Sequence, residues 1–63
     1  MPEYMVIRSC SSGSAATFFD QYSEADNFVF DLIEDLDLTY LNNIQMYKYV
    51  QGRYVFIREA KVI

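Results

Sequence analysis

One segment of the chain has the spacing of an amphipathic helix, and this segment constrains the fold more than any other feature. Between Ala25 and Leu36, apolar residues recur at steps of three and one, which matches one face of a 3.6-residue period. Ser23 is the predicted N-cap, and Asp26 three residues later approximates a capping box. Phe30 is the one apolar residue on the polar side. The apolar face consists of Ala25, Phe28, Val29, Leu32, Ile33 and Leu36.

The residues before this helix have the composition of strands. Tyr4–Cys10 is rich in β-branched and aromatic residues and is followed by a turn cluster at Ser11–Ser14. Residues 15–19 are predicted to form a second, short strand that closes a hairpin over this turn. Because alanine is a poor strand former, a loop over the same residues is the alternative.

The residues after the helix predict a hairpin, Ile44–Val50 and Arg53–Ile57 or beyond, joined by Gln51-Gly52. Glycine in this turn supplies a positive φ at little cost. A two-residue loop sets Val50 opposite Arg53, Tyr49 opposite Tyr54, Tyr47 opposite Phe56, and Met46 opposite Ile57. Alternation then gives the hairpin two faces, one with Tyr47, Tyr49, Tyr54 and Phe56, the other with Met46, Lys48, Val50, Arg53, Val55 and Ile57.

The expected order of elements is β-β-α-β-β, or β-α-β-β if residues 15–19 form a loop. Both orders predict an α+β two-layer sandwich, with the amphipathic helix on a small, mostly antiparallel sheet. A chain of 63 residues is expected to form a single small domain over residues 1–63. Because one helix covers one face of a sheet, the other face of the hairpin must meet solvent or another molecule. The sequence leaves open which face packs on the helix.

Charge is divided between the two parts of the chain. Residues 1–44 contain eight acidic residues and one basic residue, whereas residues 45–63 contain four basic residues and one acidic residue. A row of carboxylates on a helix can imitate phosphate spacing and bind a basic partner. This pattern is typical of small acidic inhibitors or nucleic-acid mimics of the phage and host-defence type, but an ordinary solvated helix face is the favoured explanation. The candidate residues are Phe30, Asp31, Glu34 and Asp35.

The hairpin rings, together with Lys48, Arg53 and Arg58, have the composition of a stacking platform for single-stranded nucleic acid. The formal net charge of −4 argues against a nucleic-acid partner, because phosphate neutralisation drives such binding. The motif of glycine and aromatic residues that is typical of RNA-recognition sheets is also missing.

The side chains that enzymes need are scarce. Cys10 is the only cysteine, and the chain has no histidine to serve as a general base or to build a zinc site. The acidic residues Asp31, Glu34, Asp35 and Asp37 do not have the alternating spacing and central glycine of a calcium-binding loop. The sequence therefore predicts a non-enzymatic protein with no cofactor and no metal.

The leading interpretation is a protein-interaction module that forms a homodimer through an exposed apolar sheet face or edge. The candidate contact residues are Tyr47, Tyr49, Tyr54 and Phe56, since large exposed apolar patches on small proteins mark interaction sites. A lone cysteine without a targeting segment predicts a cytoplasmic location. No apolar run approaches the roughly 20 residues of a membrane helix.

Overall fold

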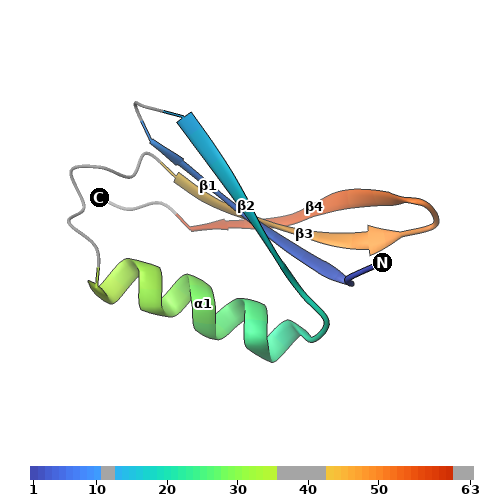
Figure 1. The fold of residues 1–63 in the computed structure, drawn as a ribbon, viewed down its shortest axis with the longest axis horizontal. Coiled ribbons are helices and arrows are strands. Elements are labelled where there is room, and N and C mark those ends of the chain that lie inside the picture. The colour runs from blue at the N-terminus through green and yellow to red at the C-terminus, as the bar shows by residue number, and fades with distance from the viewer. Residues whose placement is uncertain (11–12, 36–42, 61–63) are drawn as a thin grey trace.

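Two strands precede the helix and two follow it, so the predicted order β-β-α-β-β is confirmed (Figure 1). The computed structural model describes residues 1–10, 13–35 and 43–60. The expected strand over residues 15–19 is present and begins two residues earlier, at Gly13. The predicted contribution of Leu36 to the helix lies outside the described residues. The elements are β1 (Tyr4–Cys10), β2 (Gly13–Phe19), α1 (Tyr22–Asp35), β3 (Asn43–Val50) and β4 (Arg53–Ala60).

The four strands form one antiparallel sheet in the order β2-β1-β3-β4. β1 lies in the interior and pairs with β2 on one side and with β3 on the other. The two hairpins, β1–β2 and β3–β4, are thus joined through strands that are far apart in sequence. β2 and β4 are the edges of the sheet, and α1 lies on one of its two faces (Figure 1).

The helix begins earlier than the sequence predicts. The Ala25 N–H donates to the Gln21 carbonyl over 3.2 Å, so Gln21 occupies the N-cap position and Ser23 lies inside the first turn. The prediction of Ser23 as N-cap is therefore wrong. Asp26 also has a role other than capping, because its carboxylate accepts a hydrogen bond from Arg58 on β4. The helix starts almost as soon as β2 ends at Phe19, which leaves no room for a longer lead-in.

The buried core is small and joins the helix to the two interior strands. Around its edge, Tyr4, Phe19, Phe28 and Ala60 are half-buried, and the Phe19 and Phe28 ring centroids are 5.2 Å apart. Each fully buried aliphatic side chain contributes roughly 1.5–3 kcal/mol to folding. Ile33, predicted on the apolar face, is 39% exposed. Within residues 1–10, 13–35 and 43–60, the buried residues of the core are Val6 on β1, Ala25, Val29 and Leu32 on α1, and Ile44 and Met46 on β3.

The β3–β4 hairpin has the predicted two-residue turn. Gln51 and Gly52 both have positive φ values, 49° and 91°, as a type I′ turn requires. The predicted pairs Val50–Arg53, Tyr49–Tyr54 and Tyr47–Phe56 are confirmed.

The predicted pairing of Met46 with Ile57 is wrong. Met46 lies opposite Arg58, because a β-bulge adds one residue to β4 and leaves Ile57 without a partner in the ladder. Before the bulge the odd-numbered residues of β4 face the helix, and beyond it the even-numbered residues do. The Arg58 side chain consequently lies on the helix side of the sheet, where it meets Asp26.

Candidate interaction surface

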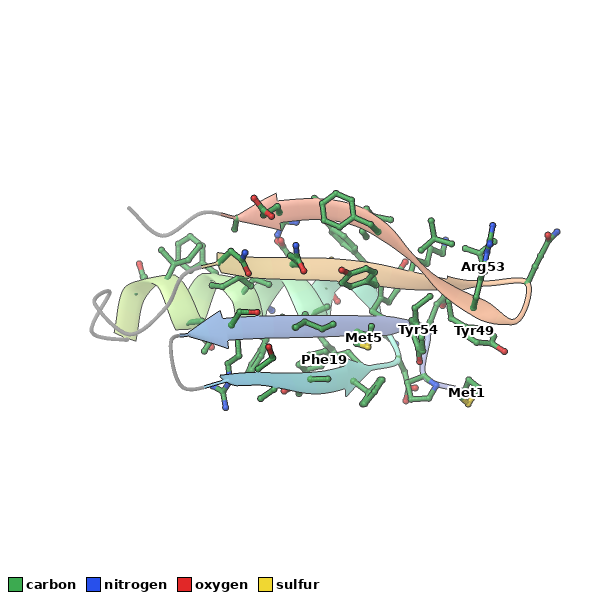
Figure 2. All side chains as sticks on the ribbon, turned by 90° about the horizontal axis from the view of Figure 1, so that it is seen from above. Met1, Met5, Phe19, Tyr49, Arg53 and Tyr54 are labelled. Carbon is green, nitrogen blue, oxygen red and sulfur yellow. The ribbon has the colours of Figure 1, made fainter. Side chains whose placement is uncertain are left out.

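The aliphatic face of β3 packs on the helix, which leaves the ring-bearing face uncovered. Ile44 and Met46 are each 1% exposed and belong to the core beneath α1. Since neighbouring residues of a strand point to opposite sides, Tyr47 and Tyr49 lie on the far side of the sheet. Figure 2 views the molecule from this side, with α1 behind the strands. This surface is here named the open face.

The strand register extends the open face over all four strands. Val6 of β1 is buried under the helix, so its neighbours Met5 and Ile7 point the other way. Met5 lies between Phe18 of β2 and Tyr47 of β3. The apolar residues of the open face are Met5, Ile7, Ala16, Phe18, Tyr47, Tyr49, Tyr54 and Phe56.

The rings on this face contact one another. Tyr47 and Phe56 are 5.7 Å apart between centroids, and Tyr49 and Tyr54 are 5.2 Å apart. Tyr54 is on one edge strand and Phe18 is on the other, yet their rings are only 5.9 Å apart. The end of the β3–β4 hairpin therefore curls over the sheet.

Tyr54 is held in place by a second contact. Its hydroxyl donates to the Pro2 carbonyl over 2.7 Å, which fixes the ring against the segment that leads into β1. Figure 2 shows the Tyr54 side chain beside that end of the strand. The tyrosines of the open face are half-buried by their neighbours, while Phe18 and Phe56 are 48% and 50% exposed. The two phenylalanines are thus the most accessible rings of the surface.

The basic residues of the hairpin lie on the opposite side from the rings. Lys48 lies over the Tyr4 ring on the helix side, and its Nζ is 3.7 Å from Glu3 Oε1. Arg58 meets Asp26 of α1. Arg53 pairs with Val50, and by alternation both project to the helix side. The structure therefore separates the rings from the bases that a nucleic-acid platform would need together.

Within the described residues, the open face carries no lysine or arginine side chain. Its acidic groups are at its margins, where Glu59 Oε2 accepts a hydrogen bond from Gln45 Nε2 over 3.2 Å. Between these margins the surface is uncharged and largely aromatic. An uncharged face of this kind suits an apolar protein surface and not a phosphate backbone.

Two of the candidate acidic residues, Asp31 and Glu34, lie on the outer side of the helix. Phe30 is 59% exposed, and Asp31 and Glu34 are also exposed on the outer side of α1. Glu34 follows Phe30 by four residues, so the two side chains are neighbours on the helix surface. Asp35 is in the last turn of α1, and its side chain lies outside the described set.

The described residues hold no group of three or more histidine, cysteine, aspartate or glutamate side chains placed to bind a metal ion. No helix among them is long and apolar enough to cross a membrane. The Cys10 side chain lies outside the described set.

Sequence reasoning missed Met5, Ile7, Ala16 and Phe18 as members of this surface. Alternation within each strand gives their direction. Their connection to the hairpin rings depends on the pairing of β1 with β3, which alternation does not reveal.

The chain matches no protein-family model, no curated protein and no solved structure. Its function must therefore be argued from its own surfaces.

Proposed function

We propose that this chain is a non-enzymatic, cytoplasmic protein-interaction module that forms a homodimer by packing its open face against that of a second copy. In this proposal each folded unit is the two-layer sandwich of sheet and helix. One observation carries the proposal: in the part of the chain that the structure describes, α1 covers one face of the sheet, and the other face presents eight apolar residues.

The distribution of charge supports a second copy as the partner. The formal net charge of the chain is −4, so two copies repel each other on average. As far as the described residues go, the open face is free of charged side chains except at its margins. Two copies that meet there bury rings and avoid that repulsion. A twofold contact of this type is isologous, the commonest arrangement in homo-oligomers.

The size of the core supports the same conclusion. Among the residues that the structure describes, six side chains are buried, and domains of this length are marginal when they stand alone. Packing a second sheet on Phe18, Phe56 and the tyrosines removes apolar surface from water at about 25 cal/mol per Å². Association therefore adds stability that the isolated chain lacks.

Sedimentation equilibrium of the full chain tests this proposal. Wild-type protein is expected to associate at tens of micromolar. Phe56→Lys places a charge in the contact and is expected to weaken association by about tenfold or more, or ~1.4 kcal/mol. Phe30→Lys is the matched control, because Phe30 is 59% exposed on the helix and not on the open face. A well-folded wild-type monomer at this concentration would contradict the proposal.

The exposure of Phe30 beside Glu34 favours a second candidate function. In it, the chain is a small acidic inhibitor or nucleic-acid mimic of the phage and host-defence type, and the helix binds a basic protein. The contact residues are Phe30, Asp31, Glu34 and Asp35. Reversal of the three acids to lysine is expected to abolish capture of the partner in a pull-down with the full chain. Capture that survives the reversal rules this candidate out.

A further inference from the structure

The free edge of β2 lacks the protection that natural edge strands have. Its residues, Gly13–Phe19, include no charged side chain and no proline. The register with β1 runs without a shift from one end of the strand to the other. Proteins usually blunt a free edge with charge, proline or a bulge, because its unpaired main-chain groups are a template for another strand.

The other edge strand, β4, has these protections. Arg53, Arg58 and Glu59 place charges along it, and the bulge at Ile57 interrupts the even spacing of its main-chain groups. The two edges of one sheet thus differ in the feature that controls strand addition. This contrast indicates that β2 is the edge that accepts a further strand.

Hydrogen bonding in the interior of the sheet shows which main-chain groups of β2 have no partner among the described strands. The Tyr49 N–H donates to the Glu3 carbonyl over 2.7 Å, one step beyond the Tyr4–Lys48 pair, so Glu3 and Tyr49 are a hydrogen-bonded pair. In an antiparallel ladder such pairs alternate with non-bonded pairs. Met5 and Ile7 therefore direct their main-chain groups toward β3.

The alternate residues of β1 direct their main-chain N–H and C=O groups toward β2 instead. Tyr4, Val6 and Arg8 pair there with Phe19, Thr17 and Ala15. It follows that the N–H and C=O groups of the remaining β2 residues point out of the sheet. The residues at the free edge are Ser14, Ala16 and Phe18.

We infer that this edge pairs antiparallel with β2 of a second copy, in a register centred on Ala16. Ala16 then lies opposite Ala16 of the second copy, and Ser14 lies opposite its Phe18. Each such pair exchanges two main-chain hydrogen bonds. Every outward N–H and C=O of Ser14, Ala16 and Phe18 thereby obtains a partner.

The strand itself favours a second copy as the occupant. Its free groups are symmetric about Ala16, so β2 is complementary to its own antiparallel image. The stretch is uncharged although the surrounding half of the chain is strongly acidic, so two copies can approach here without repulsion. Gly13–Ala16 is exposed and carries only small side chains, which leaves space beside the twofold axis.

This contact is separate from the contact between open faces. A twofold axis perpendicular to the sheet joins the two sheets edge to edge and keeps both helices on one side. The open faces of the two copies then form one continuous surface. That surface remains available for the proposed face-to-face packing, so the two contacts can exist together or alone.

Amide hydrogen exchange of the wild-type chain, followed by NMR, tests the inference directly. The Ser14, Ala16 and Phe18 amides are expected to exchange at least about tenfold more slowly than the Tyr54 and Phe56 amides. The latter two point to the outer edge of β4 and serve as internal controls. If Ser14, Ala16 and Phe18 exchange as fast as these controls, while Ala15 and Thr17 stay protected, the edge is free and the inference is wrong.

A pair of proline variants gives a second test. Ala16→Pro removes an outward N–H and is expected to keep the fold by circular dichroism while losing the edge contact. Ala15→Pro is the matched control, since it removes a hydrogen bond to β1 and is expected to destabilise the monomer. Ala16→Pro protein that stays folded and associates like wild type contradicts the inference.

Combining Ala16→Pro with Phe56→Lys separates the two contacts. With both contacts formed, face-to-face homodimers join further through their β2 edges, so wild type is expected to sediment as an assembly larger than a dimer. Each single variant is expected to sediment as a dimer and the double variant as a monomer. If the face-to-face contact does not exist but the edge contact does, Phe56→Lys protein sediments like wild type. If the edge contact does not exist but the face-to-face contact does, Ala16→Pro protein sediments like wild type.

Discussion

The two faces of the sheet are built from the same strands, yet they differ in how their apolar side chains are buried. Met46 and Tyr47 are adjacent in β3, and both are apolar enough for a core. Met46 is 1% exposed under the helix, whereas Tyr47 is half-buried against Phe56. The difference shows that the position of α1, more than the hydrophobicity of individual residues, decides which face becomes the core.

The helix also covers its own face incompletely. The end of the β3–β4 hairpin extends beyond α1 (Figure 1), and there Val50 and Val55 on the helix side remain 41% and 38% exposed. The aliphatic face is therefore a closed core near Ile44 and Met46 and an accessible surface near the turn. The contrast between a buried face and an exposed face of the sheet therefore holds only where α1 lies over the strands.

Truncation of one residue on each face is the strongest test of this comparison. Met46→Ala leaves a cavity in the core and is expected to lower the free energy of unfolding by about 2–5 kcal/mol. Phe56→Ala, on the half-exposed open face, is expected to cost the folded monomer less than about 1.5 kcal/mol. Urea denaturation at low protein concentration measures both. Equal losses would show that the open face is as important as the core for folding the monomer.

The turn fixes the register that assigns hairpin residues to each face, so changes there have an intermediate effect. Gly52 has a φ of 91° and open space at its Cβ position, so Gly52→Ala carries only a conformational cost of about 1–2 kcal/mol. Gln51→Asn is expected to have the opposite sign, because asparagine tolerates positive φ better. Thermal unfolding of both variants checks this pair. A gain from Gly52→Ala would argue against the type I′ turn.

The contact between Asp26 and Arg58 links α1 to β4. Its removal is expected to lower the free energy of unfolding less than the other changes do. Its side chains are 45% and 43% exposed, so Asp26→Asn is expected to cost roughly 0.2–1 kcal/mol, and less at high salt. Glu34→Gln, on the outer side of α1, is the control. Urea denaturation at two salt concentrations gives the comparison, and a loss that does not change with salt would indicate a role other than charge pairing.

Most of the local structure could be predicted from the sequence. The period of Ala25–Leu32 identified the helix, and Gln51-Gly52 identified the turn and three correct cross-strand pairs. Local patterns contain this information because each depends on residues only a few positions apart. The prediction of the ring-bearing face likewise needed only alternation from the turn to Tyr47.

The remaining features depend on contacts that no short window contains. The helix start was missed because Gln21 is not a preferred capping residue, while Ser23 is. The strand order β2-β1-β3-β4 joins residues some forty positions apart, such as Met5 and Tyr47. Without that order, neither the extent of the open face nor the identity of the edges could be predicted.

The bulge in β4 has a consequence for how this chain tolerates changes in length. β4 holds one residue more than its ladder with β3 uses, since Tyr47 pairs with Phe56 and Met46 with Arg58. Loss of Ile57 would leave every cross-strand partner and every buried position unchanged. In the interior of β1, which pairs on both sides, loss of one residue instead moves its neighbours to the wrong face. A comparison of related chains should therefore allow a gap at Ile57 before it allows one in β1.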